Sequence, residues 1–309
     1  MALRLSIRPP EDYLFRRDVC SYGYFLLAPN DWDPAEQTFS RPLELPGGIA
    51  RFTLRQPSDA PGGPIIAQAD RSIDRADAAA ARKLITRMLR LDDTDVAAFH
   101  RVDNRWKKSG RGRLFRSPTL FEDVVKTVTS CNVQWPSTIV MNRRLCEVVH
   151  PAFPSAAKLA RVRPATLRAR CRVGYRDARL VELAKMFARG EVDVGAMEDP
   201  ATPDADVVAM LLELPGIGPY AAHNILQLLG RYSQLPLDTE SVRHGKAVLG
   251  MDGSDKDVMR QVARHFDRFG DHKFRSYWFE LWRFYEAKKG PAWTWDPETT
   301  GSAFTASKL

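Results

Sequence analysis

The chain has 309 residues, of which 44% are hydrophobic, 10% aromatic and 27% charged, and this composition excludes a disordered or fibrous protein. The length suffices for two or three domains, and we find neither a membrane-spanning run of ~20 apolar residues nor a secretory signal, which predicts a cytosolic or nuclear protein. The net charge of +8 favours an anionic partner, and basic charge is concentrated in residues 101–190, which contain 20 Lys and Arg but only 6 Asp and Glu.

The N-terminal part of the chain, about 75 residues, contains short runs of apolar, aromatic and β-branched residues separated by Pro and Gly. These runs are Leu3–Ile7, Tyr22–Leu27, Ile49–Leu54 and Ile65–Ala69. The spacing of the runs predicts an antiparallel sheet. No residue in this part suggests chemistry.

A helix is predicted over Asp70–Leu91, where alanines and larger apolar residues recur at helical spacing. Trp106–Arg116 follows as a basic loop rich in Gly and Lys, which we interpret as a linker that contacts an anionic backbone. A basic surface that is only solvated is the alternative interpretation of this loop and of the wider basic excess.

The next helix is predicted over Leu120–Ser130 and ends in the segment Thr129–Trp135. Asn132 lies between this helix and another that begins near Pro136. Asparagine in this position either caps the second helix or projects from the loop for another purpose. Further along, Arg176 and Arg179 precede a helix that ends near Phe187, and they either contact phosphates or solvate that helix.

The sequence from Val207 through residue 229 predicts two short helices joined by a tight turn. Gly216 and Gly218 frame this turn, and Pro219 occupies the first position of the second helix, where proline is favoured. The unpaired N–H groups and positive dipole end of that helix suit a phosphate group. The hairpin is therefore predicted to bind phosphate, with a purely structural turn as the alternative.

A carboxylate follows the hairpin, because Asp238 stands eighteen residues beyond Tyr220 at the end of the apolar segment Leu235–Leu237. Two or three more helices are predicted after Arg243, and the last, Phe274–Lys288, is rich in aromatic residues. The tail that begins at Gly290 is expected to be loosely ordered.

The hairpin and the aspartate together resemble a known family. Leu-Pro-Gly-Ile-Gly with Ala221 and Ala222, followed by Leu-Pro-Leu-Asp-Thr, resembles the helix-hairpin-helix and aspartate signature of the DNA glycosylases related to endonuclease III. The predicted N-terminal sheet resembles the branch that contains 3-methyladenine DNA glycosylase II and 8-oxoguanine DNA glycosylase, since endonuclease III lacks it.

The resemblance implies an α+β fold, with an N-terminal antiparallel β domain followed by a mostly α-helical, two-lobed body that carries the helix-hairpin-helix. The expected divisions are a β-sheet domain (1–75), a helix and basic linker that pack with the C-terminal helices (76–116), a helical domain with the helix-hairpin-helix at 204–229 and the catalytic Asp loop (117–240), and C-terminal helices with a tail (241–309).

Site residues follow from the same resemblance. Asp238 corresponds to the catalytic carboxylate, and Asn132 to the side chain that fills the gap left by a flipped base. The residues expected to contact DNA are Gly216, Ile217, Gly218, Tyr220, Asn132 and Arg243. The residues expected to line the base pocket are Tyr220, Trp135 and Trp282.

Two departures from the family pattern are informative. Bifunctional relatives place a nucleophilic lysine where this chain has Tyr220, which implies an enzyme that uses water and has no lyase activity. Several relatives have a histidine near the DNA backbone where this chain has Glu240, so that contact is in doubt.

Metal cofactors are not expected. The four cysteines form no Cys-x-x-Cys pair, and none follows Cys171, where many relatives of endonuclease III bind an iron–sulfur cluster. The predicted absence concerns the iron–sulfur cluster and zinc, while a monovalent cation at the hairpin remains an option.

The expected function is that of a monofunctional DNA glycosylase of base excision repair, acting on an alkylated purine such as 3-methyladenine in double-stranded DNA. The alternatives are a glycosylase for an oxidised or deaminated base and a non-catalytic helix-hairpin-helix DNA-binding protein. We expect a monomer without membrane association, located with the nucleoid if bacterial and in the nucleus if eukaryotic.

Overall fold

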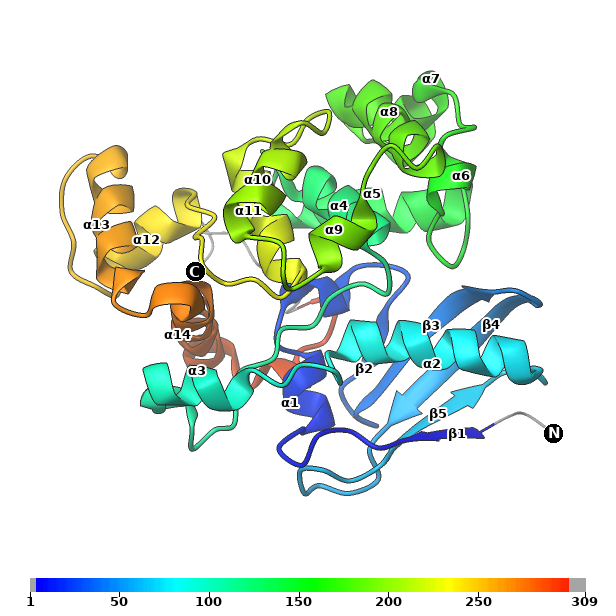
Figure 1. The fold of residues 1–309 in the computed structure, drawn as a ribbon, viewed down its shortest axis with the longest axis horizontal. Coiled ribbons are helices and arrows are strands. Elements are labelled where there is room, and N and C mark those ends of the chain that lie inside the picture. The colour runs from blue at the N-terminus through cyan, green and yellow to red at the C-terminus, as the bar shows by residue number, and fades with distance from the viewer. Residues whose placement is uncertain (1–3, 300–309) are drawn as a thin grey trace.

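A five-stranded antiparallel sheet forms the N-terminal part of the computed structural model, which describes residues 4–299 (Figure 1). The strands are β1 (Arg4–Ile7), β2 (Asp31–Asp33), β3 (Thr38–Leu45), β4 (Gly48–Arg55) and β5 (Ile65–Ala69). Their order in the sheet is β1-β5-β4-β3-β2. Burial alternates along β3 and β4, as expected for a sheet with one face against a core. The predicted antiparallel sheet is confirmed.

One predicted strand is wrong, because the run Tyr22–Leu27 contains the 3₁₀ helix η1 (Gly23–Leu26). The consecutive side chains from Tyr24 to Leu27 are all buried, whereas a half-buried strand would bury alternate ones. The Asn30 side-chain amide also donates to the Tyr24 carbonyl oxygen at 2.8 Å and closes the turn. As a result, this segment leaves the sheet.

Helix α2 (Arg75–Leu89) follows the sheet and lies along it (Figure 1). Asp74 caps the helix by accepting a hydrogen bond from the Asp77 N–H at 2.8 Å. The Asp77 carboxylate in turn accepts from the Gly47 N–H at 2.7 Å, in the turn between β3 and β4. Because the N-cap is Asp74, the helix begins at Arg75 rather than at the predicted Asp70.

The rest of the described chain is helical. The remaining α-helices are α1 (Phe15–Val19), α3 (Val96–Val102), α4 (Leu120–Ser130), α5 (Trp135–Val148), α6 (Ala156–Leu159), α7 (Pro164–Thr166), α8 (Asp177–Ala188), α9 (Val194–Glu198), α10 (Asp204–Leu212), α11 (Pro219–Leu228), α12 (Thr239–Ala247), α13 (Asp255–Asp267) and α14 (Lys273–Lys289). The other short helical turns are η2 (Asn104–Trp106), η3 (Leu167–Cys171), η4 (Gly174–Arg176), η5 (Gly270–His272) and η6 (Ala292–Thr294). Within residues 4–299, no helix combines the length and the apolar character needed to cross a membrane.

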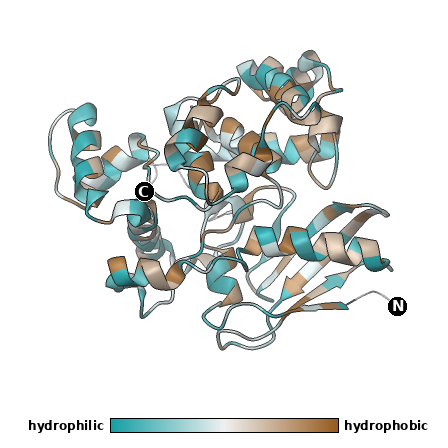
Figure 2. Cartoon of the chain, in the orientation of Figure 1, coloured by the Kyte–Doolittle hydropathy of each residue, from teal (hydrophilic) through white to brown (hydrophobic). Residues whose placement is uncertain are grey.

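Two hydrophobic cores divide the molecule. The first joins the sheet and α2 to α14 through residues such as Phe39, Ile85 and Trp282. The second lies among α4, α5, α8, α10 and α11, with Val124 and Ile225 among its residues. The outer helix α13 is mostly hydrophilic, whereas the helices of the second core carry many apolar residues (Figure 2). Residues distant in sequence therefore share a core, and the two cores meet near the middle of the molecule.

The C-terminal tail packs against the body as far as it is described, contrary to the expected loose order. Trp295 is 1% exposed and lies 5.2 Å from the Trp282 ring, measured between centroids. The Trp32 indole N–H of β2 donates to the Trp293 carbonyl oxygen at 2.9 Å. Residues 300–309 lie outside the described part.

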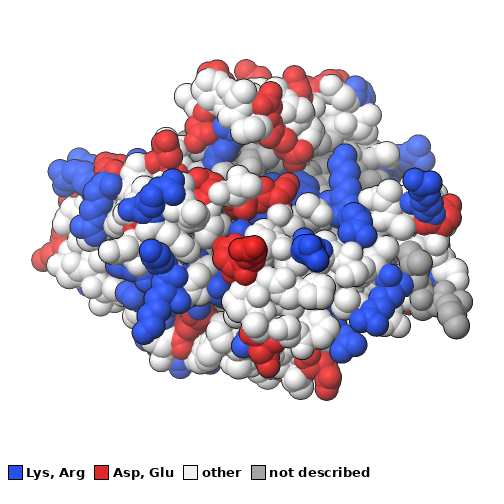
Figure 3. All heavy atoms as spheres, turned by 60° about the horizontal axis from the view of Figure 1, so that its bottom comes forward, with Lys and Arg blue, Asp and Glu red and all other residues white. Residues whose placement is uncertain are grey.

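Two arginines at the basic loop after α3 are paired within the protein. Arg105 forms an ion pair with Glu280 at 2.5 Å, and Arg111 forms one with Glu286 at 2.5 Å, so both arginines attach the loop to α14. Basic and acidic side chains are also interspersed over the face drawn in Figure 3. Within the predicted loop Trp106–Arg116, Arg111 is therefore neutralised inside the protein, whereas Lys107 and Lys108 are exposed, and the interpretation of the loop as a backbone contact stays a prediction.

Candidate active site

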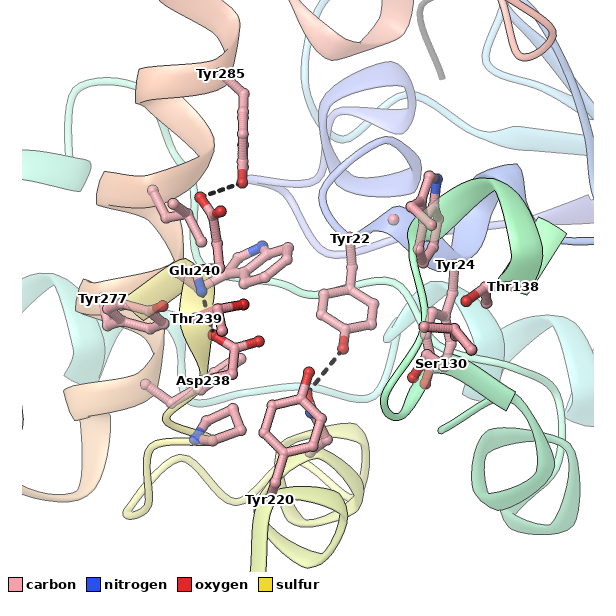
Figure 4. Close-up of a pocket in the computed structure, with 18 of the residues that line it drawn as sticks. Tyr22, Tyr24, Ser130, Thr138, Tyr220, Asp238, Thr239, Glu240, Tyr277 and Tyr285 are labelled. Carbon is pink, nitrogen blue, oxygen red and sulfur yellow. Dashed lines mark hydrogen bonds between the residues drawn. The ribbon is translucent and has the colours of Figure 1, made fainter. Parts of the chain in front are cut away.

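A cavity of about 450 Å³ lies where the two cores meet (Figure 4). Its walls come from η1, the loop between α4 and α5, the start of α11, the start of α12 and one side of α14. Eight of the lining residues are aromatic: Tyr22, Tyr24, Trp135, Tyr220, Phe274, Tyr277, Trp278 and Tyr285. In the described part of the chain, the two formally charged residues of the wall are both acidic, Asp238 and Glu240.

Asp238 is the N-cap residue of α12, and this role fixes its side chain at the cavity wall. Its Oδ1 accepts hydrogen bonds from the Glu240 N–H and the Ser241 N–H, both at 3.0 Å. Ser241 accepts a hydrogen bond from the Asp238 N–H at 3.2 Å, and its hydroxyl also contacts the Tyr277 hydroxyl of α14 at 2.9 Å. Backbone N–H groups thus hold Oδ1 of the carboxylate, and no backbone N–H of the described residues holds the other oxygen.

The surroundings of Asp238 make its carboxyl harder to ionise. Burial raises its pKa above the ordinary value of 3.8, and the negative charge of Glu240 raises it further. Hydrogen bonds from Ser241 and Tyr220 oppose this rise. A perturbed carboxyl group in a cavity is a candidate for catalysis on physical grounds.

The raised pKa predicts an acid limb in the activity. If the ionised form of Asp238 acts, the single-turnover excision rate should fall as the pH drops through a midpoint above 3.8. Tyr220→Phe removes a hydrogen bond that lowers this pKa, so the variant's midpoint should move to higher pH. Rates from about pH 4 to 8, corrected for uncatalysed base loss, measure both midpoints. A rate that stays constant to the lowest pH would contradict the role of Asp238.

The predicted hairpin lies beside this cavity, between α10 and α11. Gly216 has a φ of +81°, and a Cβ atom there would lie 2.9 Å from Arg179 Cδ, so the turn requires glycine. Pro219 opens α11, and no side chain of the described residues caps this helix. Its first N–H groups are therefore available to an external acceptor such as a phosphate oxygen.

Substitutions of the two hairpin glycines should distinguish the effect of backbone strain on stability from the effect of a side chain on the approach of DNA to the turn. Gly216→Val forces a strained turn and should lower both the melting temperature and the affinity for damaged and undamaged duplex alike, the affinity by about tenfold. Gly218 has room for a Cβ atom, so Gly218→Val should weaken binding without loss of stability.

Gly250→Val is the matched control, in the loop after α12. Gly250 also has a positive φ, of +66°, and no heavy atom of the described chain lies within 4 Å of the position that a Cβ atom would take. The substitution should lower stability and leave duplex affinity unchanged. Affinity loss confined to damaged duplex in the hairpin variants would instead place the turn in the base pocket.

Asn132 projects from the loop between α4 and α5. It is exposed, has a φ of +53°, and its side-chain amide lies 3.5 Å from the hydroxyl of Tyr175, which is itself 53% exposed. Gln134, not Asn132, is the N-cap residue of α5, so the capping alternative is wrong. Asn132 of this loop and Tyr175 of η4 thus form an exposed polar pair, and the loop residues that follow Asn132 line the cavity.

Arg176 fixes the position of this loop. Its buried guanidinium donates to the Val128 carbonyl oxygen at 3.0 Å and to the Cys131 carbonyl oxygen, at the C-terminal end of α4. These carbonyls have no partner within the helix, and a cation stabilises the negative end of the helix dipole. Arg176 therefore acts inside the protein, and both of its sequence-based alternatives, phosphate contact and solvation, are wrong.

Two of the residues expected in the base pocket line the cavity, and one does not. Trp135 and Tyr220 are in the wall. Trp282 is 2% exposed and donates its indole N–H to the Cys20 carbonyl oxygen, one layer behind the wall. Its stacked neighbour on α14, Trp278, faces the cavity instead, at a ring distance of 5.3 Å from Trp282.

The N-terminal segment also reaches the cavity, although the sequence suggested no chemistry there. Tyr22 packs on Trp278 with ring centroids 4.7 Å apart and donates its hydroxyl to the Asn224 Oδ1 of α11 at 3.2 Å (Figure 4). Tyr24 lies beside Tyr22 in the wall, with ring centroids 4.8 Å apart. The Tyr-Gly-Tyr sequence is a signal that could have marked this segment, since a glycine between aromatic residues is unfavourable in a strand.

Arg243 contacts protein groups in the described structure. It forms an ion pair with Glu240, and its guanidinium carbon lies 4.3 Å from the centre of the Phe284 ring. Glu240 thereby neutralises the cation that was expected to contact DNA. The assignment of Arg243 as a DNA contact stays a prediction.

Comparison with known proteins identifies the fold. No family model matches the sequence, and no curated protein matches it. MBOgg1, solved with a low-affinity DNA ligand, has a TM-score of 0.68 at 14% identity, covering 92% of this chain and 96% of its own. A 3-methyladenine DNA glycosylase from Archaeoglobus fulgidus has a TM-score of 0.67 at 19% identity, with coverage of 91% and 99%.

An 8-oxoguanine glycosylase/lyase from Clostridium acetobutylicum has a TM-score of 0.64 at 14% identity, with coverage of 90% and 97%. Enzymes of different substrate classes thus have similar scores, and at these identities the likeness concerns the fold. The expected α+β architecture, with its N-terminal sheet, is confirmed. The chain has the fold of the helix-hairpin-helix DNA glycosylases.

Proposed function

We propose that this protein is a monofunctional DNA glycosylase that hydrolyses the N-glycosidic bond of a flipped, damaged base and leaves an abasic site. The observation that carries the proposal is the position of Asp238, fixed as a helix cap at the wall of an aromatic cavity, with a glycine hairpin and the uncapped start of α11 beside it. Double-stranded DNA is the partner that this arrangement fits. The likeness of fold to solved glycosylases supports the same function.

The chemistry follows from the geometry. Breaking the bond builds positive charge on the sugar, and the Asp238 carboxylate stabilises that charge electrostatically while its second oxygen orients the attacking water. Because Oδ1 is already held by two backbone N–H groups, little reorganisation is needed during the reaction. Asn132 and Tyr175 fill the gap left in the duplex when the base rotates into the cavity.

The absence of lyase activity rests on Tyr220. A lyase needs an amine that attacks C1′, and no lysine of residues 4–299 lines this cavity. Tyr220 lies in the wall near Asp238, and its hydroxyl lowers the pKa of that carboxyl by hydrogen bonding. A tyrosine hydroxyl cannot form an imine, so water remains the nucleophile.

An alkylated purine is the substrate that the cavity suits best. The wall presents the faces and edges of aromatic rings, which bind a flat base by stacking and favour one with positive charge. Alkylation at a ring nitrogen gives the purine such a charge and weakens its bond to the sugar. This substrate therefore needs the least help from a leaving-group acid, and among the described residues neither a histidine nor a lysine lines the cavity to supply such help.

A lesion panel with borohydride trapping tests the proposal. Duplexes with one 3-methyladenine, 7-methylguanine, hypoxanthine, uracil or 8-oxoguanine should show release of the alkylated bases, and strands should break only after alkali or an added abasic-site nuclease. Borohydride should trap no protein–DNA adduct. Efficient trapping would mean that another residue serves as nucleophile, and release of only 8-oxoguanine, hypoxanthine or uracil would support the alternative substrate classes. Duplex binding without release of any base would support the non-catalytic alternative.

A further inference from the structure

Glu240 is a second carboxylate at the cavity, in the first turn of α12, and its position is fixed by two neighbours. Its Oε1 accepts from the Arg243 Nε at 2.6 Å and from the hydroxyl of Tyr285, on the aromatic side of α14 (Figure 4). No hydrogen bond to its Oε2 occurs among residues 4–299. One oxygen is therefore anchored, and the other is available to a ligand in the cavity.

The location of Glu240 argues against a role at the DNA backbone. A carboxylate that faced a phosphate would weaken binding by repulsion, and the neighbouring cation, Arg243, is already paired with Glu240 and held against the Phe284 ring. Glu240 lines the same cavity as Asp238, Tyr22 and Trp278. The side chain therefore belongs to the space that receives the base.

Two carboxylates in one cavity are costly unless a cation joins them. The single basic group that contacts them is Arg243, which pairs with Glu240 and leaves Asp238 without a cationic partner among the described residues. The repulsion also raises the pKa of Asp238. A positively charged occupant would relieve it, whereas a neutral base would not.

We infer that Glu240 is a specificity-determining residue, whose unpaired oxygen selects bases that carry a formal positive charge, such as purines alkylated at a ring nitrogen. The inference rests on the proposed function and goes beyond it, because it assigns the discrimination between cationic and neutral bases to one side chain. Tyr285 and Arg243 are positioning residues in this arrangement, since they hold Oε1 and leave Oε2 toward the cavity.

The test compares two bases of the same shape and different charge. Duplexes containing 2′-fluorinated 7-methylguanine or its neutral isostere, 2′-fluorinated 7-methyl-7-deazaguanine, resist hydrolysis and so report binding alone. Wild-type protein should prefer the cationic duplex by about tenfold. Glu240→Gln, which keeps the size and the acceptor oxygen, should reduce this preference several-fold and leave only the part that the aromatic wall supplies.

Arg243→Met shifts the preference in the opposite direction. Removal of the compensating cation leaves the negative charge of Glu240 unbalanced, so this variant should favour the cationic duplex more strongly than wild type. This second variant keeps the test decisive if Glu240→Gln does not fold. The matched control is Glu213→Gln, an exposed glutamate next to the hairpin, which should change affinity for both duplexes equally. Unchanged preference in Glu240→Gln, with or without a lower melting temperature, would overturn the inference.

Cleavable 7-methylguanine duplex separates this inference from the proposed function. Base release by wild type without any preference for the cationic fluorinated duplex would end the role of Glu240 and leave the glycosylase proposal intact. If wild type released no base from any lesion duplex, the proposed function itself would fail and the inference with it.

Discussion

Substitution of Asp238 by asparagine is expected to lower single-turnover excision by about 10²–10³-fold, the usual cost of removing one preorganised electrostatic group. Asparagine caps helices as well as aspartate does, so the hydrogen bonds from the N–H groups of Glu240 and Ser241 should persist. The loss should therefore appear in the chemical step, measured with enzyme in excess over lesion duplex. Duplex affinity should stay within a few-fold of wild type.

The same substitution, Asp238→Asn, should leave the thermal stability of the protein unchanged or raise it. The pKa of Asp238 is raised in the folded protein, so its favourable contribution to folding is complete only below the unfolded pKa and is lost as the pH rises through the folded pKa. At neutral pH the ionised carboxylate costs stability, and Asp238→Asn should melt at an equal or higher temperature than wild type. Asp74→Asn, which alters the N-cap of α2 away from the cavity, is the matched control and should leave excision unchanged. Near-normal excision by Asp238→Asn would show that another group performs the chemistry.

Substitution of Glu122 by glutamine is expected to lower the free energy of unfolding by about 3–5 kcal/mol, because it leaves buried cations without their counter-charge. Glu122 lies in α4, and its carboxylate pairs with Arg41 of β3 at 3.0 Å and with Lys126 of α4 at 2.7 Å. The three side chains are 5%, 1% and 0% exposed, respectively. The network joins the sheet to the helical body, so its loss should be measurable by chemical denaturation of the whole chain.

The control for this prediction is Glu182→Gln on α8. Glu182 is 49% exposed, and its nearest cations, Lys185 and Arg189, lie at 4.0 Å and 3.8 Å, so the change should cost less than about 0.5 kcal/mol. Adding Lys126→Met to Glu122→Gln should recover part of the loss, since it removes one of the uncompensated charges. Equal effects of Glu122→Gln and Glu182→Gln would mean that the buried network contributes no more than a surface pair.

The hairpin and the candidate carboxylate, Asp238, could be identified from sequence because the features that mark them are local. A turn that requires glycine at Gly216, a proline at the first position of α11 and a cap at Asp238 all depend on residues a few positions apart. The same holds for Tyr220, whose place is fixed by its distance along the chain from the hairpin glycines. Runs of β-branched and aromatic residues likewise predicted the strands β4 and β5.

The cavity could not be derived in this way, because its walls come from segments near opposite ends of the chain, from Tyr22 to Tyr285. Helical periodicity shows that α14 is aromatic on more than one side but not which side faces the cavity. The sequence therefore predicts Trp282 in the wall, whereas the structure has Trp278 there. A local sequence pattern also does not show which side chains contact each other in the fold. Only the tertiary structure shows that Arg243 and Tyr285 both hold the same oxygen of Glu240.

The contacts of the basic residues could not be predicted from sequence either. The sequence established how much basic charge residues 101–190 carry, but only the tertiary structure decided where it is used: Arg176 holds the end of α4, and Arg105 and Arg111 pair with α14. A guanidinium is driven to pair wherever folding places it out of water, and its partner is chosen by packing between elements distant in the chain. The sequence by itself therefore determined the local features of this protein, which are the turn, the helix cap and the carboxylate. The tertiary structure decided which residues line the cavity and which partners the charged side chains contact.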